Sequence, residues 1–362
     1  MGGFNYNSIW MTVLLLSITV VIHEYGHFVT ARAFGVTVYE FSVGFGPLIG
    51  KFKRKGIQYS LRWILIGGFC KIAGMDMTLE GETKDPETRP ERLFYNLPLW
   101  KRLVVLATGP FFNFLTALVV FFSLLIFIGI PVIDSVNIER ISPQSPAVTA
   151  GLHPGDKITA INNQAIKQSS DLTKLVQQSA GNPLRIKISR NGEQLIKEIT
   201  PIYSPESKRY LMGVVIRDVP KFERATLRKA AGMTASLPWT TIKFLGMLIR
   251  GQIKGGVMGP IGAVDMVEQS LQLPPQFIWF SILSFASSIS MSLFLFNMLP
   301  LPLPILDGGW IVIFILERLF RREFSADQKA AAYTIGLIAI LTVTVLITYG
   351  DLVRLLKRFL GG

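Results

Sequence analysis

Cysteine and histidine are scarce in this sequence. Its 362 residues include 1 cysteine, Cys70, and 3 histidines. A single cysteine excludes an intramolecular disulfide bond and a cysteine-based metal cluster. We expect Cys70 to serve as a small buried hydrophobic residue.

Acidic residues are also few. The 24 Asp and Glu residues are outnumbered by 37 Lys and Arg residues, and the formal net charge is +13. The basic residues are scattered among acidic and apolar ones and form no single stripe, which argues against a nucleic-acid-binding protein. We expect anionic lipid headgroups to be the partner of this charge.

Long apolar stretches dominate the chain, and 50% of its residues are hydrophobic. Crossing the hydrocarbon core of a bilayer takes about 20 residues. The sequence therefore predicts a polytopic α-helical membrane protein with four transmembrane helices. The first stretch has no basic segment before it and no small-residue cleavage site after it, so we expect it to stay in the mature protein and not to act as a signal peptide. The four stretches are 8–28, 103–130, 277–299 and 331–349.

Lys and Arg are frequent in the loop after the first stretch and in the loop after the third. The positive-inside rule places both loops in the cytoplasm. Both termini and the long segment between the second and third stretches are then external. Arg354, Lys357 and Arg358, near the C-terminus, oppose this orientation.

A metal-site pattern, His23-Glu24-Tyr25-Gly26-His27, lies at the end of the first apolar stretch. On a helix, positions four apart share a face, so His23 and His27 can bind one metal ion while Glu24 reaches a water molecule beside it. The same pattern occurs by chance on soluble helices, where both histidines are ordinary. Ionisable groups at membrane depth are costly and mark functional sites, which favours the metal site here.

A catalytic zinc site usually has three protein ligands, so a distant residue has to supply the third. Asp307 is a candidate, because it follows a proline-rich segment in which the third apolar helix would break. A carboxylate among apolar neighbours needs a positive partner, and a metal ion is one. In the alternative, Asp307 is the N-cap of a helix over 310–319. The local sequence favours neither.

The loop after the first stretch contains sequence typical of β-structure. The segments 41–47, 57–66 and Gly67-Gly68-Phe69 mix glycine with β-branched and aromatic residues. An apolar non-helical segment at membrane depth must be buried in protein or line a cavity. We expect a membrane-associated β-hairpin-like element beside the metal site. The alternative is a small cytoplasmic hairpin that contacts nothing catalytic.

Residues 131–215 change in character to short β-rich runs around one helical stretch, 170–179, which predicts a soluble α+β module. The run SPAVTAGLHPGDKITAIN, at 145–162, resembles the core of a bacterial PDZ domain. PDZ domains bind an extended peptide as an added strand. Met212-Gly213-Val214 is the candidate edge for such a peptide. In the alternative, the glycines serve turns only and the module is a spacer or a gate.

The chain is thus expected to have four parts. Residues 1–130 form an N-terminal membrane part with the HExxH helix, and 131–215 form the PDZ domain. Residues 216–276 form an amphipathic linker, in which 222–255 is typical of a helix on the membrane surface. Residues 277–362 form a C-terminal membrane part with the Leu-Asp-Gly segment.

Several motifs recur in an order that resembles the site-2 protease family, of the bacterial regulator-of-sigma-E-protease type. The resemblance covers nearly the whole chain. The motifs are HExxH in the first stretch, FSVGFGP, GGF, Pro98-Leu-Trp-Lys-Arg102, Gly109-Pro110-Phe-Phe-Asn113, one PDZ domain, Gly259-Pro260-Ile-Gly262 and Leu-Asp-Gly at 306–308.

This resemblance implies a zinc ion on His23, His27 and Asp307, with Glu24 as general base. The implied reaction is hydrolysis of a peptide bond within a transmembrane segment. The family pattern N-x-x-P-x-P-x-L-D-G is two residues shorter than the segment here, and Asn297 is the candidate for polarising the scissile carbonyl. Asn113 is a candidate substrate contact, with a structural hydrogen bond between helices as the alternative.

By the same resemblance, the substrates are single-pass membrane proteins, such as anti-sigma factors, or remnant signal peptides in the bacterial inner membrane. The external PDZ module would admit substrates already shortened by another protease. A helical substrate would have to unwind, and pairing with the segment from Gly67 to Phe69 would be one means. Two alternatives are a metal transporter, which would carry several ionisable groups in the later spans, and a catalytically inactive membrane-anchored PDZ adaptor.

Overall fold

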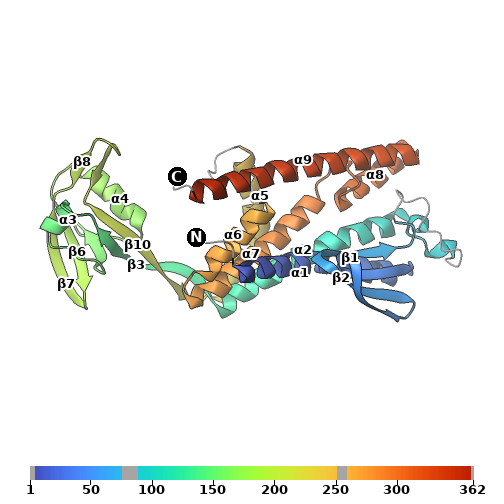
Figure 1. Ribbon diagram of the computed structural model, residues 1–362, viewed down its shortest axis with the longest axis horizontal. Helices are drawn as coiled ribbons and strands as arrows, with labels where there is room; N and C mark the ends of the chain where they lie inside the picture. The colour runs from blue at the N-terminus through green and yellow to red at the C-terminus, as the bar shows by residue number, and fades with distance from the viewer. Residues whose placement is uncertain (1–4, 76–88, 251–258, 360–362) are drawn as a thin grey trace. The chain divides into compact units, whose positions relative to one another are not determined.

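The computed structural model describes residues 5–75, 89–250 and 259–359. Parts of the predicted first loop (76–88) and of the predicted linker (251–258) lie outside these described residues. The chain divides into two compact units, which are treated one at a time below (Figure 1). Unit 1 combines Met1–Leu124 with Leu227–Gly362, and unit 2 is Leu125–Thr226.

Four long apolar helices confirm the prediction of a polytopic α-helical protein. Each is long and apolar enough to cross a bilayer. Apolar side chains on the last of them, such as Val345 and Leu346, are about two-thirds exposed, which suits a surface in contact with lipid. The four helices are α1 (Tyr6–Ala33), α2 (Leu99–Phe127), α7 (Pro275–Asn297) and α9 (Ala326–Phe359).

Further helices belong to the described part of unit 1. They are the 3-10 turns η1 (Pro90–Arg92) and η2 (Phe94–Asn96) and the helices α5 (Leu227–Ile249), α6 (Pro260–Leu271) and α8 (Asp307–Phe320).

Carboxylates from neighbouring helices bind the N-terminal amides of α6 and α1. Asp351 of α9 accepts hydrogen bonds from the backbone N–H groups of Gly259, at 3.0 Å, and Gly262, at 2.8 Å. Glu268 of α6 accepts from the N–H of Asn5, just before α1, at 3.4 Å. The first amides of a helix lack partners within the helix and carry partial positive charge, so these carboxylates stabilise both helix starts and tie α1, α6 and α9 together.

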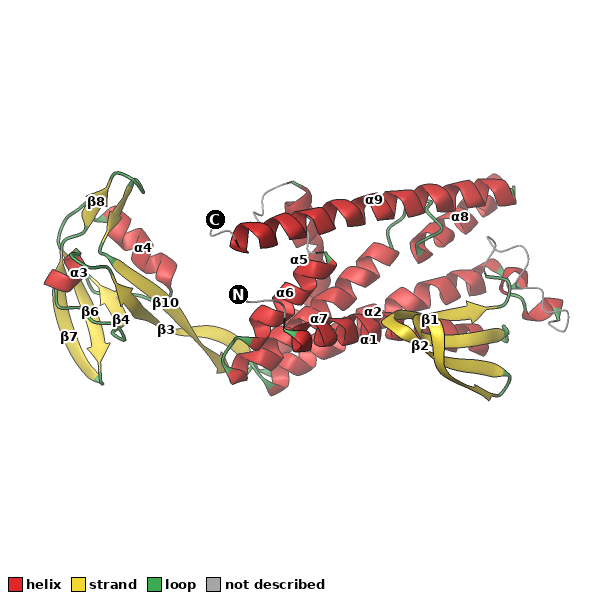
Figure 2. Ribbon diagram, in the orientation of Figure 1, coloured by secondary structure: helices red, strands yellow, loops and turns green. Residues whose placement is uncertain are grey.

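The predicted β-hairpin is present as β1 (Val38–Arg54) and β2 (Ile57–Ile72), joined at Lys55 and Gly56 (Figure 2). Both strands are long and fold back on themselves. The start of β1 pairs with the end of β2, as in Val38 with Ile72, and also with the start of β2, as in Glu40 with Gln58. The end of β2 is therefore an edge of this small sheet.

Glycine permits the bends in this sheet, and one arginine ties them together. Gly44 and Gly67 have φ values of +85° and +100°, which favour glycine. Arg62 binds Glu40 at 2.8 Å and Ser42 at 3.1 Å, and its guanidinium lies 5.3 Å from the ring centre of Phe69. These contacts join the start of β1 to both halves of β2.

Unit 2 is the predicted α+β module. Its main sheet has the strand order β10-β3-β4-β6-β7, with β5 paired to β4, and β8 and β9 form a separate pair. The predicted helical stretch is α4 (Ser169–Gln178), and α3 is Pro146–Thr149. The strands are β3 (Ile130–Ile141), β4 (Lys157–Ile161), β5 (Gln164–Ala165), β6 (Leu184–Arg190), β7 (Glu193–Ile199), β8 (Ile202–Ser204), β9 (Arg209–Leu211) and β10 (Val214–Glu223).

The segment Met212-Gly213-Val214 leads into β10, the strand at one edge of this sheet. Met212 is buried, and Gly213 has a φ of +78°. A Cβ atom on Gly213 would lie 2.1 Å from the Cβ of Ser145, so only glycine fits this turn. Peptide binding at this edge stays a prediction.

An ion pair with a buried carboxylate holds the turn before β4. Asp156, whose side chain is 1% exposed, accepts from Nε of Arg190 at 2.7 Å and from the backbone N–H of His153 at 2.8 Å. Burial raises the pKa of Asp156, but the hydrogen bonds from Arg190 and His153 outweigh it and hold the pKa below the usual range. The ionised carboxylate therefore stabilises the folded unit.

We expect Asp156→Asn to lower the stability of unit 2 by about 2 kcal/mol, because a buried charged hydrogen-bond partner is lost. Hydrogen exchange of the full-length protein in detergent, at pH 7, measures this as faster exchange in β4 and β6. Since the folded pKa lies below the unfolded one, the wild-type contribution is present above about pH 4 and is lost as the pH falls further. The matched control is Glu139→Gln, which breaks the more exposed pair with Arg217; equal effects of the two substitutions would contradict the assignment.

Candidate active site

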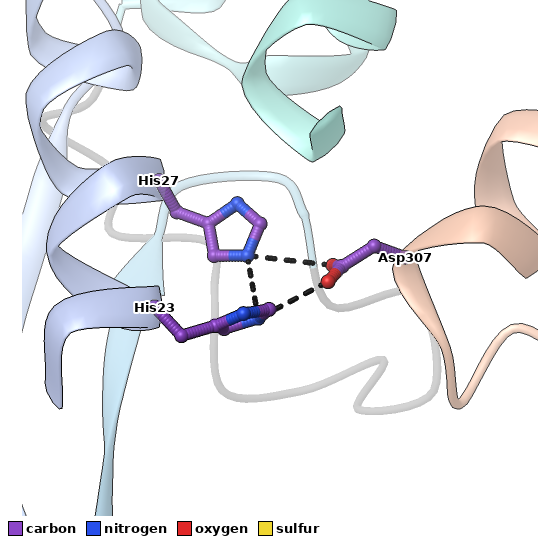
Figure 3. A group of neighbouring side chains, drawn as sticks. All are labelled: His23, His27 and Asp307. Atoms are coloured by element: carbon purple, nitrogen blue, oxygen red, sulfur yellow. Dashed lines mark hydrogen bonds and ion pairs between the residues drawn. The ribbon is translucent and has the colours of Figure 1, made fainter. Parts of the chain in front are cut away.

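Three candidate metal ligands from distant parts of the chain meet in unit 1 (Figure 3). His23 and His27 lie one turn apart on α1, and both are buried. Their Nε2 atoms are 3.2 Å apart. The Asp307 carboxylate lies 3.1 Å from Nε2 of His23 and 3.4 Å from Nε2 of His27. Each of the three residues offers one potential ligand atom. These three atoms all lie within 4.8 Å of one another.

The chemistry of this donor set suits a metal ion. Two imidazole nitrogens and one carboxylate oxygen are ligands of the kind found in catalytic zinc sites, which keep a further position open. Within the described ranges, the ion-pair partners of Asp307 are the two imidazoles alone. The side chain of Asp307 is only 13% exposed. A carboxylate so largely removed from water favours a positive partner, and a divalent cation held between the three groups would be one.

Asp307 is presented by a sharp return of the chain between α7 and α8. The N-cap of α8 is Leu306, so Asp307 is the first residue of the helix and not its cap. A Cβ on Gly308 would lie 2.6 Å from the carbonyl oxygen of Leu299, and one on Gly309 would lie 1.9 Å from that of Leu303. The two glycines let the start of α8 pack directly on the preceding backbone. The two residues by which the segment from Asn297 to Asp307 exceeds the family pattern lie within this return.

Two other glycines bring α2 against α1 at the same place. A Cβ on Gly26 would lie 2.4 Å from the carbonyl oxygen of Thr108, and one on Gly109 would lie 2.1 Å from Nε2 of His27. The imidazole of His27 therefore occupies the space that a side chain at 109 would need. Gly109 was part of a recognised motif, but the sequence did not indicate this contact.

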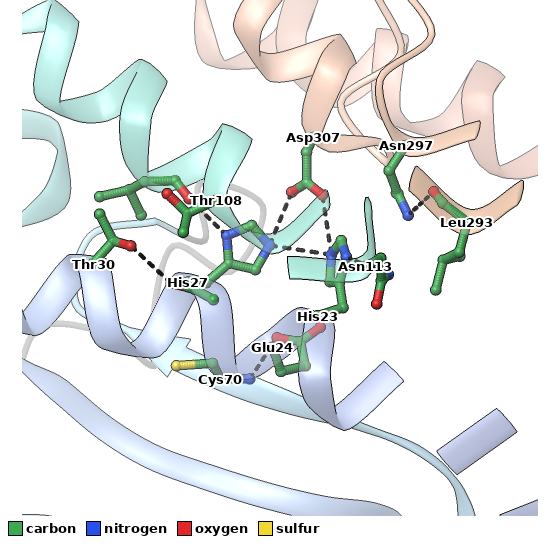
Figure 4. A network of polar contacts seen from close by, with 12 residues as sticks. His23, Glu24, His27, Thr30, Cys70, Thr108, Asn113, Leu293, Asn297 and Asp307 are labelled. Carbon is green, nitrogen blue, oxygen red and sulfur yellow. Dashed lines mark hydrogen bonds and ion pairs between the residues drawn. The ribbon is translucent and has the colours of Figure 1, made fainter. Parts of the chain in front are cut away.

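The second ring nitrogen of each histidine faces α2 (Figure 4). Nδ1 of His27 lies 2.9 Å from the carbonyl oxygen of Val105. Nδ1 of His23 lies 3.3 Å from the side-chain amide nitrogen of Asn113. Val105 was missed by sequence reasoning, because a backbone carbonyl leaves no mark in the residue type.

Glu24 bridges α1 and the edge of the small sheet. Its carboxylate accepts a hydrogen bond from the backbone N–H of Cys70, in β2, at 3.0 Å (Figure 4). Ser17, two turns earlier on α1, donates to the carbonyl oxygen of Leu65. Two side chains of α1 thus hold the end of β2, and the segment from Gly67 to Phe69 lies between these attachments.

These groups open onto a cavity of about 290 Å³. Apolar side chains of α1, β2 and α7 contribute to its walls. Asn297, at the end of α7, lies on the wall and donates its side-chain N–H to the carbonyl oxygen of Leu293 at 3.1 Å. Asn113 is not among the lining residues. The polar residues that line the cavity are His23, Glu24, His27, Cys70, Asn297 and Asp307.

Fold and site together define a multi-pass membrane protein that carries a potential metal-binding HExxH helix. The sequence matches the model of peptidase family M50 over residues 11–343. The chain therefore belongs to peptidase family M50.

Whole-length relatives agree with this assignment. The chain is 30% identical to Metalloprotease MmpA of Caulobacter vibrioides, with 97% of this chain and 96% of the relative covered. It is 24% identical to Zinc metalloprotease RasP of Shouchella clausii, with 96% and 99% covered. A solved PDZ domain of an SdrC-like protein from Listeria monocytogenes aligns with 23% of this chain and 87% of its own length, at 21% identity and a TM-score of 0.22.

We expect Gly109→Ala to weaken metal binding at least about tenfold, because the added Cβ would displace the His27 imidazole. Metal affinity of the purified protein, measured by competition with a chromophoric chelator, checks this. Gly232→Ala in α5 is the matched control, since a Cβ there meets no atom within 4 Å. Unchanged affinity in Gly109→Ala would show that the ligand set tolerates a wider spacing of α1 and α2.

Proposed function

We propose that this protein is an intramembrane zinc metalloprotease in which His23, His27 and Asp307 hold the zinc ion. One observation carries the proposal: the Nε2 atoms of two buried histidines on a long apolar helix face a carboxylate that comes from more than 270 residues further along the chain. The names of the relatives, which include a zinc metalloprotease, support zinc as the metal.

Zinc bound there would act as a Lewis acid toward a water molecule and a carbonyl group. Glu24 is next to His23 in sequence and lies on the same cavity. Its carboxylate would take a proton from the attacking water and deliver it to the nitrogen of the leaving amine. Asn297 would donate a side-chain N–H to the scissile carbonyl oxygen. One N–H of this amide is bonded to the carbonyl oxygen of Leu293, and the second N–H is the donor for this role.

The proposed substrate is the transmembrane segment of a single-pass membrane protein. In an α-helix each peptide group is engaged within the helix, so the segment has to unwind before a carbonyl can be attacked. The edge of β2 offers a place for the unwound segment to pair. The N–H of Cys70 points away from β1 toward Glu24, so Cys70 and Gly68, two residues apart, direct their backbone groups to the free edge.

The setting proposed for this reaction is the bacterial cytoplasmic (inner) membrane, with both termini and the PDZ-like unit 2 on the external side. Substrates would be anti-sigma factors or remnant signal peptides that another protease has already shortened outside the membrane. The distribution of Lys and Arg between the apolar stretches and the resemblance to the regulator-of-sigma-E-protease type support this setting.

We expect Glu24→Gln to lower the cleavage rate at least about 100-fold while leaving one zinc ion bound per chain, because the base is lost and the ligands are kept. Cleavage of a tagged single-pass substrate in detergent and zinc analysis of the same sample measure both quantities. Asp307→Asn is the companion variant and should lose zinc as well as activity. Cleavage by Glu24→Gln at the wild-type rate would refute the role of Glu24.

We expect a bound substrate to contact β2 with the periodicity of a strand. A photoreactive residue is placed at successive positions of the substrate, and cross-links to Glu24→Gln protein are mapped by mass spectrometry. Cross-links to the segment from Ile66 to Cys70 should form from every second position of the substrate, because the side chains of a strand alternate between two faces. Labels spaced three and four residues apart would mean that the substrate binds as a helix.

A further inference from the structure

Each imidazole of the proposed metal site has one nitrogen directed at Asp307 and the other directed at α2. Nδ1 of His27 lies 2.9 Å from the carbonyl oxygen of Val105. A carbonyl oxygen only accepts hydrogen bonds, so Nδ1 of His27 carries the proton. Its Nε2 then keeps the lone pair that a metal ion requires.

His23 faces a side-chain amide in the corresponding place. The Nδ2 atom of Asn113 is 3.3 Å from Nδ1 of His23, and Oδ1 of Asn113 is buried with no hydrogen-bond partner in the described part of the chain. An amide nitrogen only donates, so in this orientation His23 carries its proton on Nε2, where a metal ligand needs a lone pair. A rotation of the Asn113 amide by about 180° around its Cβ–Cγ bond would exchange the positions of Nδ2 and Oδ1 with almost no change in the volume that the side chain occupies.

We propose that Asn113 is a positioning residue that accepts a hydrogen bond from Nδ1–H of His23 when the metal is bound, and so fixes the tautomer of His23 that binds metal. This inference rests on the metal site proposed above. In the present orientation Oδ1 of Asn113 has no partner in the described part of the chain, whereas the rotated amide would place it opposite Nδ1–H of His23. A partner on the second ring nitrogen is a common feature of metal-binding histidines.

The surroundings of Asn113 suit this role better than contact with substrate. Asn113 is 0% exposed and is not among the residues that line the cavity. Its backbone is fixed from the other side by Ser290 of α7, whose hydroxyl donates to the carbonyl oxygen of Asn113 at 3.1 Å. The side chain is therefore held behind His23, where a substrate would not reach it.

The first test is the zinc affinity of the full-length protein in detergent, measured by chelator competition. Asn113→Leu has a similar volume and no acceptor, and we expect it to bind zinc about 10 to 100-fold more weakly than wild type. Asn113→Asp keeps an acceptor at the same place and should stay within about threefold of wild type. Ser290→Ala is the packing control, since it loses the contact to the backbone of Asn113 and leaves His23 untouched.

The second test reads the ring hydrogen bond directly. The chain has 3 histidines, so ¹⁵N-histidine labelling gives few signals, and His153, in unit 2, is an internal reference. In the zinc-loaded protein, the ring N–H signal of His23 should shift between wild type and Asn113→Leu. The ring N–H signal of His27 should not, because its acceptor is the carbonyl of Val105.

The outcomes separate this inference from the proposed function. Wild-type affinity in Asn113→Leu, or an unmoved His23 signal, would overturn the role of Asn113 and leave the metal site intact. An equal loss in the Leu and Asp variants would assign Asn113 to helix packing and overturn it too. Failure of the wild type to bind zinc would refute the metal site itself.

Discussion

A carboxylate largely removed from water among apolar helices is costly without a positive partner, and the site in unit 1 is built around this constraint. Asp307 reaches the imidazoles of His23 and His27, and the described residues place no Lys or Arg in ion-pair contact with it. The three groups meet only if three parts of unit 1 are in place. These are the helix that carries both histidines, the return of the chain before α8 and the packing of α2 on α1. A metal ion would give this arrangement its largest stabilising contact.

Close backbone packing at glycines allows His23, His27 and Asp307 to come together. A side chain at Gly109 would collide with His27, and one at Gly308 would collide with the carbonyl oxygens of Asn297 and Leu299. Because Gly26 also packs on the backbone of Thr108, α1 and α2 approach more closely than side chains would allow. The geometry of the site is thus a property of helix packing, and the positions that matter for it extend well beyond the ligands.

Local periodicity explains which features could be predicted from the sequence. Four spans follow from apolar length, and the pairing of His23 with His27 follows from the helical repeat. The role of Asp307 could not be decided locally, because its partner lies on another helix. The folding of β1 and β2 back on themselves depends on pairing between segments that no local pattern specifies. Contacts made by backbone atoms, such as the carbonyl of Val105 and the N–H of Cys70, are independent of residue type and leave no trace in the sequence.

The hydrogen bond between Glu24 and the N–H of Cys70 limits where a paired substrate could be cut. A strand added at the edge of β2 could use the outward groups of Gly68, but it would compete with Glu24 for the N–H of Cys70. As long as Glu24 keeps that N–H, pairing has to end beside Cys70. In the proposed reaction, the first unpaired peptide bond of the substrate would then lie next to the proposed base, Glu24, and next to His23 on the same helix turn. If Glu24 is the base, as proposed, its hydrogen bond to Cys70 would both orient it and select the peptide bond that it acts on.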